Sequence, residues 1–289
     1  MSICIMTDSN SGITQSEGEK LGVPVVPMPF TINGTDYLED INLGQEEFYN
    51  LLDLKAVVLT SQPSAGALMD LWKKVLKDYD EIVYIPMSSG LSKSCETATF
   101  LSNEKEFKNK VFVVNNQRIS VTQKQSVLDA MYLRDEKKMS AKDIKDLLEK
   151  TKLESSIYIT VDSIDYLRRG GRITAAAATF AKLLKIKPVL QIQGEKLDAF
   201  DKVRGMKGAK RSMLDQIKKD INERFGGLDN VHVFVAYTAC KDTAIEFCEM
   251  IKEEIGEVEV CDPLSLSVSC HIGPGALAVA CTKKIETFI

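Results

Sequence analysis

The feature that most constrains the fold is the alternation of strand-like and helix-like segments in the first half of the chain. Short apolar runs typical of buried strands lie at residues 2–7, 81–87 and 110–115. Apolar residues with helical spacing occupy residues 46–54, 64–77, 92–101, 120–136 and 140–150. Ser140 and Asp143 are spaced like a capping box at the start of the last of these. This alternation predicts a parallel sheet with helices on its faces.

Residues 23–38 interrupt the alternation. Three prolines exclude a helix over residues 23–32, which we expect to be extended. Asn33-Gly34 is a strong hairpin turn signal, and it predicts a return strand at residues 35–38.

The second half repeats the mixed pattern. Strand-like runs lie at residues 156–161, 188–193, 196–200, 231–237, 258–261 and 276–281, and residues 194–195 suit a hairpin turn. Helices are expected at residues 174–185, 208–224 and 243–254, and a loop at residues 262–275. A charged stretch at residues 150–154 separates the two patterns. We therefore expect an N-terminal α/β domain over residues 1–152 and a C-terminal α/β domain over residues 153–289.

Composition excludes several classes of function. The 289 residues suffice for two domains, and 44% hydrophobic with 27% charged residues is typical of a soluble protein. A net charge of −4 argues against nucleic-acid binding driven by bulk charge. No apolar run reaches the ~18 residues of a membrane span, and no signal peptide is visible. Seven cysteines without a CxxC pair suggest reduced thiols, so we expect a cytoplasmic protein. Two histidines exclude a His-rich metal centre, and we expect no metal and no cofactor.

Two clusters of hydroxyl residues follow apolar segments of the first domain, at residues 56–59 and 81–87, and we expect them at equivalent strand ends of the parallel sheet. They are TSQPS at residues 60–64 and SSGLS at residues 88–92. Ligands of parallel sheets bind at the carboxyl ends of strands, where the N–H groups of a helix N-terminus form an anion site. Hydroxyls of Thr60 and Ser92 would add donors there. The alternative is that both clusters only cap helices and form turns.

Three further segments could carry polar contacts. Arg168, Arg169 and Arg172 flank a pair of glycines and would suit a carboxylate or a phosphate, or form a solvated surface turn. His271 lies in a tight Gly-Pro-Gly context and is either a ligand contact or a structural residue, whereas we interpret His232 as structural. Basic residues at 202–211 form either a solvated face or a docking surface for an acidic partner.

Taken together, the motifs resemble those of the DegV family. In chain order they are TDSN at 7–10, TSQPS at 60–64, SSGLS at 88–92, LRRGGRI at 167–173, IKPVL at 186–190 and HIGPG at 271–275. The order is that of the family, and the motifs span nearly the whole chain. Asn10 replaces a serine of the family pattern, and Lys93-Ser94 replace the usual Gly-Thr.

The resemblance implies a two-domain fold that binds one long-chain fatty acid between its domains. It implies no catalysis by this chain: a separate ATP-dependent fatty acid kinase converts the bound carboxylate to an acyl phosphate for phospholipid synthesis. By motif match, the expected carboxylate contacts are Thr60, Ser61, Ser92, His271 and Arg172. Arg204 and Lys207 would dock the kinase. We expect no stable membrane insertion.

A fatty acid also needs an apolar path, and the helix expected at residues 174–185 offers small and large apolar side chains. The expected lining residues are Ala176, Phe180, Leu183, Leu184 and Ile192. Ordinary helix packing is the alternative for these residues.

Two other functions stay open. One is a serine esterase or acyltransferase with Ser92 as nucleophile, His271 as base and Asp8 as a third member, although GLSKS lacks the final glycine of G-x-S-x-G. The other is a carrier of a different lipid-like anion without a kinase.

Overall fold

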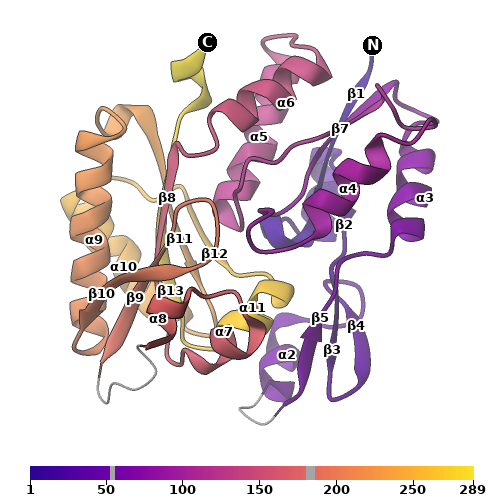
Figure 1. Ribbon diagram of the computed structural model, residues 1–289. Helices are drawn as coiled ribbons and strands as arrows, with labels where there is room; N and C mark the ends of the chain where they lie inside the picture. Colours follow the sequence, from indigo (N-terminus) through magenta and orange to yellow (C-terminus); the bar gives the residue numbers. More distant parts are fainter. Residues whose placement is uncertain (53–55, 180–185) are drawn as a thin grey trace. The chain divides into compact units, whose positions relative to one another are not determined.

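The computed structural model describes residues 1–52, 56–179 and 186–289 (Figure 1). The chain divides into two compact units. Unit 1 comprises Met1–Lys152 and Ser265–Ser267, and unit 2 comprises Leu153–Leu264 and Val268–Ile289. The segment Ser265–Ser267 groups with unit 1 because the Leu266 N–H and the Ser267 hydroxyl both donate hydrogen bonds to the Glu39 carboxyl group.

Unit 1 is built on a parallel sheet of four strands in the order β2-β1-β6-β7. These strands are β1 (Ile3–Asp8), β2 (Val25–Val26), β6 (Glu81–Ile85) and β7 (Val111–Val113). The short helices η1 (Ser9–Ser11) and α1 (Gln15–Leu21) follow β1. The parallel sheet predicted from the alternating pattern is therefore confirmed.

Helices cover both faces of this sheet, as Figure 1 shows. They are α3 (Ala65–Val75), α4 (Ser94–Ser102), α5 (Val121–Asp135) and α6 (Ala141–Lys150). Cys4 and Met6 of β1 pack with Trp72 of α3 in one apolar cluster. Thr7, which points to the opposite face, accepts a hydrogen bond from Gln123 of α5. Because both faces are covered, the strands consist almost entirely of buried residues.

A second, antiparallel sheet in unit 1 has the strand order β4-β3-β5. Its strands are β3 (Pro29–Ile32), β4 (Thr35–Leu38) and β5 (Val58–Thr60), with α2 (Gln45–Leu51) beside them. Asn33 and Gly34 both have positive φ, at 52° and 81°, which confirms the predicted hairpin turn. We expected Thr60 and Ser92 at equivalent strand ends of one parallel sheet. That expectation was wrong, because β5 pairs antiparallel with β3 in this separate sheet.

Unit 2 contains a mixed sheet of six strands in the order β10-β9-β8-β13-β11-β12. The strands are β8 (Ser155–Thr160), β9 (Lys187–Ile192), β10 (Asp198–Val203), β11 (Val231–Tyr237), β12 (Val260–Pro263) and β13 (Leu277–Lys283). Strands β9 and β10 form the predicted antiparallel hairpin. The helices are α7 (Asp165–Gly170), α8 (Ala175–Ala178), α9 (Gly205–Glu223), α10 (Lys241–Glu254) and α11 (Leu266–Ile272), with η3 (Leu228–Asn230) and η4 (Ile285–Phe288).

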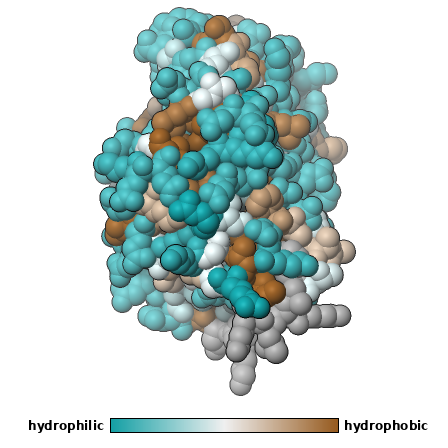
Figure 2. Space-filling model, turned by 90° about the vertical axis from the view of Figure 1, so that its left-hand side faces the viewer, coloured by the Kyte–Doolittle hydropathy of each residue, from teal (hydrophilic) through white to brown (hydrophobic). Residues whose placement is uncertain are grey.

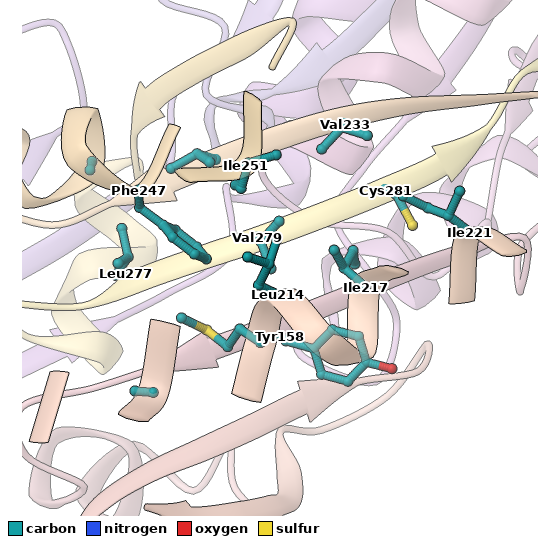
Figure 3. Packing of buried hydrophobic residues seen from close by; sticks show 14 of the residues in the cluster. Tyr158, Leu214, Ile217, Ile221, Val233, Phe247, Ile251, Leu277, Val279 and Cys281 are labelled. Carbon is teal, nitrogen blue, oxygen red and sulfur yellow. The ribbon is translucent and has the colours of Figure 1, made fainter. Parts of the chain in front are cut away.

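An apolar cluster of unit 2 lies under α9 and α10, and Figure 3 shows part of it. Phe247 and Ile251 of α10 meet Val279 of β13 there, together with residues of α9 such as Leu214 and Ile217. We call this group the helix-side core. Figure 2 views the side on which α9 lies in Figure 1. That face is mostly hydrophilic, with hydrophobic side chains only in small separate groups.

Two parts of unit 2 differ from the sequence expectation. The predicted loop at residues 262–275 contains helix α11, which the sequence conceals because serines alternate with apolar residues there. The arginine segment, for which one alternative was a solvated surface turn, forms the last turn of helix α7 and its C-cap. Of the helix expected at residues 174–185, the described part is α8, Ala175–Ala178.

Candidate functional site

Thr60 and Ser61 follow the small sheet of unit 1. Thr60 ends β5 and is partly exposed, and the exposed Ser61 donates its backbone N–H to the Pro29 carbonyl oxygen at 3.1 Å. Ser64, not Thr60, caps α3, because its hydroxyl accepts the Ala67 N–H at 3.1 Å. Helix capping therefore explains the serine at position 64. It does not explain why Thr60 and Ser61 occur in this turn.

The Ser88–Ser92 turn follows β6 at the carboxyl edge of the parallel sheet. The buried Ser88 donates its N–H to the Arg118 carbonyl oxygen at 2.8 Å and accepts the Ser92 N–H at 3.1 Å. The Ser92 hydroxyl accepts the Ser94 N–H at 3.1 Å, so it lies at the start of α4. The turn therefore brings the hydroxyls of Ser88 and Ser92 to the N-terminal end of α4, the kind of position where anions bind.

Asp8 holds the beginning of this turn from within the core. One carboxylate oxygen accepts the Met87 N–H at 2.9 Å. The other accepts the Asn10 N–H, the Asn10 side-chain amide and the Gln123 side-chain amide, at 3.0–3.1 Å. Both oxygens thus serve to position the backbone beside Ser88. Sequence reasoning weighed Asp8 only as a third member of a catalytic triad and missed this role.

Lys93 departs from the family pattern, but its side chain lies away from the protein interior. Its ammonium group pairs with Glu96 one turn along α4 at 2.8 Å, and the two side chains are 76% and 57% exposed. The lysine therefore adds a solvated ion pair to the helix surface.

In unit 2, the structure brings His271 and Arg172 together around the paired glycines. A methyl group on Gly170 would lie 2.2 Å from His271 Nδ1, so the ring rests directly against the backbone at the end of α7. Gly171 has a positive φ of 68° and forms the left-handed C-cap of that helix. Arg172 donates to the Gly170 carbonyl oxygen. The first glycine thus makes room for the histidine, and the second ends the helix.

The other two arginines of the motif have separate partners. Arg168 forms an ion pair with Asp165 at 3.0 Å, with both side chains at least half exposed. Arg169 lies over the ring of Tyr166, with its guanidinium 5.0 Å from the ring centroid. Of the three, Arg172 is therefore the arginine positioned beside His271.

The turn after His271 is held by Thr238, a fully buried residue that the sequence did not single out. Its hydroxyl donates to the Gly273 carbonyl oxygen at 2.7 Å and accepts the Ala276 N–H at 2.9 Å. A methyl group on Gly273 would meet the Tyr166 ring at 2.4 Å. The Gly-Pro-Gly segment is therefore a tightly packed support for the histidine.

The His271 imidazole is electrically neutral in this setting. Burial lowers its pKa to about 4, and the positive charge of Arg172 acts in the same direction. At neutral pH the ring therefore carries one N–H group and no charge, and the positive charge of the pair is that of Arg172. This combination suits a carboxylate ligand.

The predicted lining and docking residues occupy varied positions. Ala176 is exposed on α8 and Ile192 is buried on β9, whereas Phe180, Leu183 and Leu184 lie outside the described residues.

Arg204 is exposed at the start of α9, and Lys207 is exposed in its first turn. Neither cation forms an ion pair with a described residue.

Other kinds of site find no support in the described parts of the chain. Within residues 1–52, 56–179 and 186–289, no three His, Cys, Asp or Glu side chains gather as metal ligands would. None of the helices described there has the length and apolar character needed to cross a bilayer.

Comparison with known proteins gives consistent matches over the whole chain. The model of the DegV family matches residues 2–284. A DegV domain-containing protein from Deinococcus radiodurans is 30% identical over 289 residues, covering 97% of this chain and 98% of that protein. A fatty-acid-binding DegV family protein from Thermus thermophilus is 26% identical, with a TM-score of 0.88 over 98% of this chain and 100% of that chain. The fatty-acid-binding protein DegV from Bacillus subtilis is also 26% identical, with a TM-score of 0.85 and the same coverage.

Proposed function

Because this chain belongs to the DegV family, we propose that it binds one long-chain fatty acid and holds its carboxylate with Thr60, Ser61, Ser92, His271 and Arg172. The observation that carries the proposal is the neutral His271, set against Gly170 and next to Arg172. The related proteins from Thermus thermophilus and Bacillus subtilis, which bind fatty acids, support the ligand class.

The head group is the costly part of the ligand. An ionised carboxylate that leaves water without hydrogen-bond partners is strongly destabilised. Hydroxyls of Thr60 and Ser92, the N–H of the neutral His271 ring and the charge of Arg172 would offset that cost. Hydrogen bonds to a charged group each contribute about 1.5–3 kcal/mol, so these donors decide which end of the ligand binds here.

The acyl chain would supply most of the affinity. Burying one methylene group yields about 0.8 kcal/mol, so a chain of ~15 yields roughly 12 kcal/mol before the costs of association. Those costs are about 4 kcal/mol or more. We propose that Ala176, Phe180, Leu183, Leu184 and Ile192 line the path of the chain.

We further propose that the bound carboxylate is presented, in the cytoplasm, to a separate ATP-dependent fatty acid kinase. A carboxylate oxygen attacks the γ-phosphorus of ATP, ADP leaves, and an acyl phosphate forms for phospholipid synthesis. Exposed Arg204 and Lys207 at the start of α9 are the proposed contact for the kinase.

The carboxylate contacts are tested by the double variant Thr60→Ala, Ser92→Ala, with Ser64→Ala as the matched control. The readout is displacement of a fluorescent long-chain fatty acid by palmitate. We expect the double variant to bind at least about 10-fold more weakly, because hydrogen bonds to the charged carboxylate are lost. Ser64→Ala should lose about 1 kcal/mol of stability as its helix cap is removed, with its affinity unchanged. Wild-type affinity in the folded double variant would refute the assignment.

The esterase alternative is tested on the same protein. A chromogenic acyl ester should not be hydrolysed above background if the chain only carries the fatty acid. If the ester is hydrolysed and Ser92→Ala abolishes the hydrolysis, the chain is an enzyme and not only a carrier.

The docking assignment is tested with an added fatty acid kinase. Phosphorylation of the bound fatty acid that is weaker for Arg204→Glu than for the wild type would support it.

A further inference from the structure

The loop that joins β7 to α5, residues 114–120, lies at the same edge of the parallel sheet as the Ser88–Ser92 turn. We call it the β7–α5 loop. In the strand order β2-β1-β6-β7, the chain leaves β1 towards one side and leaves β6 towards the other. Parallel sheets bind ligands at the carboxyl ends of strands where the direction reverses in this way. The β7–α5 loop therefore borders the Ser88–Ser92 part of the proposed carboxylate site.

Two hydrogen bonds tie the β7–α5 loop to the segments that follow β1 and β6. The Arg118 carbonyl oxygen accepts the Ser88 N–H at 2.8 Å, and the Ser120 N–H donates to the Asn10 carbonyl oxygen at 2.9 Å. Strands β1 and β6 are the two strands at which the direction reverses. The shape of the loop therefore helps to determine where the Ser88–Ser92 turn lies.

The backbone of the β7–α5 loop is strained. Gln117 and Ser120 have positive φ angles of 56° and 55°, which residues with a β-carbon rarely adopt. The ψ angle of Ser120 is −137°, so this residue has a conformation that suits glycine. Such conformations persist only where the surrounding structure holds them in place. The loop therefore needs an anchor.

Arg118, which lies between the two strained residues, supplies this anchor. Its side chain is only 3% exposed, which is rare for an arginine. On α5, Ser126 Oγ accepts a hydrogen bond from Nη1 at 3.2 Å, and an Asp129 carboxylate oxygen lies 4.0 Å from the same nitrogen. Nη2 donates to the Thr151 carbonyl oxygen at 3.2 Å, at the negative, C-terminal end of α6. One guanidinium group thus fastens the loop to two helices.

We propose that Arg118 is a positioning residue for fatty acid binding. Its guanidinium group holds the strained loop against α5 and α6, and its carbonyl oxygen holds the Ser88 N–H and with it the turn that carries Ser92. This role rests on the proposed carboxylate site, because Arg118 acts through the turn and not on the ligand. A lysine would keep the charge beside Asp129, but it lacks the planar fork that reaches both helices.

Hydrogen exchange followed by mass spectrometry tests, without any ligand, whether Arg118 holds the turn. In the wild type, the Ser88 and Ser92 N–H groups are both hydrogen-bonded to carbonyl oxygens. In Arg118→Met, we expect the peptide that contains residues 88–92 to exchange about 10-fold faster or more, because the turn opens locally. Strand β8 of unit 2 should keep its wild-type rate. Arg118→Lys should give an intermediate rate in the turn.

Displacement of a fluorescent long-chain fatty acid by palmitate measures the consequence for binding. We expect affinity to fall about 10-fold in Arg118→Met and less in Arg118→Lys, because the Ser92 hydroxyl is no longer held for the carboxylate. Val75→Ala is the control, since it removes buried methyl groups from the last residue of α3. It should lower the midpoint of urea unfolding and leave both affinity and exchange in the turn unchanged.

The assignment is overturned if folded Arg118→Met keeps the wild-type exchange rate in the turn or the wild-type affinity. If Arg118→Met does not fold, the same two results for Arg118→Lys decide, because that variant leaves Asp129 with a cation. A wild-type protein that does not bind palmitate would refute the proposed function. The exchange rates would then still decide whether Arg118 holds the turn.

Discussion

At the scale of single residues, the structure makes His271 depend on the absence of a side chain at position 170. The imidazole ring occupies the space where a β-carbon would stand, and Arg172 donates to the carbonyl oxygen of the same glycine. The histidine, the arginine and the glycine therefore act as one arrangement. The sequence singled out all three, but their packing could not be predicted, because about 100 residues separate His271 from the glycines.

The first prediction concerns Gly170→Ala. The added methyl group forces the His271 ring away, so we expect fatty acid affinity to fall about 10-fold or more as the hydrogen bond to the carboxylate is lost. Overpacking should also cost about 1–3 kcal/mol of stability. Fluorescent fatty acid titration and urea unfolding measure the two effects. Gly44→Ala is the control, because nothing lies within 4 Å of a β-carbon there. Equal affinities for Gly170→Ala and wild type would refute the proposed role of His271.

The second prediction concerns Asp8→Asn. Every group that faces the Asp8 carboxylate is an N–H donor: the Met87 and Asn10 backbones and the Asn10 and Gln123 side-chain amides. An asparagine must turn its own NH₂ group towards one of them. We expect a loss of about 1–3 kcal/mol in urea unfolding, since a buried donor is left unpaired.

The exposed Asp70→Asn on α3 is the control and should leave stability unchanged. A urea-unfolding curve of Asp8→Asn that overlays that of the wild type would show that the carboxylate does not hold the Ser88–Ser92 turn.

At the scale of elements, the start of α11 is fastened by a buried carboxyl group. Glu39 accepts the Ser9 hydroxyl at 2.6 Å and the Leu266 N–H. The Ser267 hydroxyl lies 2.8 Å from Glu39 and 2.7 Å from Asn10 Oδ1, but its one proton can serve only one of them. Burial raises the pKa of Glu39 to about 7.

This gives the third prediction, a pH dependence. The folded pKa of Glu39 lies above the usual value of about 4.3, so its stabilisation is present at low pH and is lost as pH rises through about 7. His271 has the opposite sign, because its lowered pKa adds stability as pH rises towards about 6.5. Glu39→Gln isolates the first effect. We expect wild-type stability, measured relative to Glu39→Gln, to fall by roughly 2 kcal/mol between about pH 5 and pH 8. Parallel urea-unfolding curves at all pH values would contradict this.

Local signals predicted some elements well and missed others for a physical reason. The Ser140 hydroxyl accepts the Asp143 N–H, as the capping-box spacing predicts, and Asn33-Gly34 forms the expected hairpin. Both depend on neighbours within a few residues. Helix α11 was missed because its first turn is fixed by Glu39, more than 200 residues away. Strand β5 was assigned to the wrong sheet because strand pairing is a long-range choice.

At the scale of the whole molecule, the DegV family match extends over almost the entire chain. The match covers residues 2–284, and the related fatty-acid-binding structures superpose with TM-scores of 0.85 and 0.88. The alternation of strands and helices predicted the fold class, and motif order predicted the family. Chain length and unsaturation of the ligand depend on side chains along the acyl path, which local patterns do not fix.

The most direct test of the central claim is mass spectrometry of freshly purified protein, run under native conditions and again after denaturing extraction. We predict one adduct per chain that is released as a free long-chain fatty acid, and whose mass gives the chain length and unsaturation. A variant carrying both Thr60→Ala and Ser92→Ala should lose most of this adduct, whereas Ser64→Ala should keep it. A wild-type protein that carries no fatty acid and takes up none when palmitate or oleate is added would contradict the account.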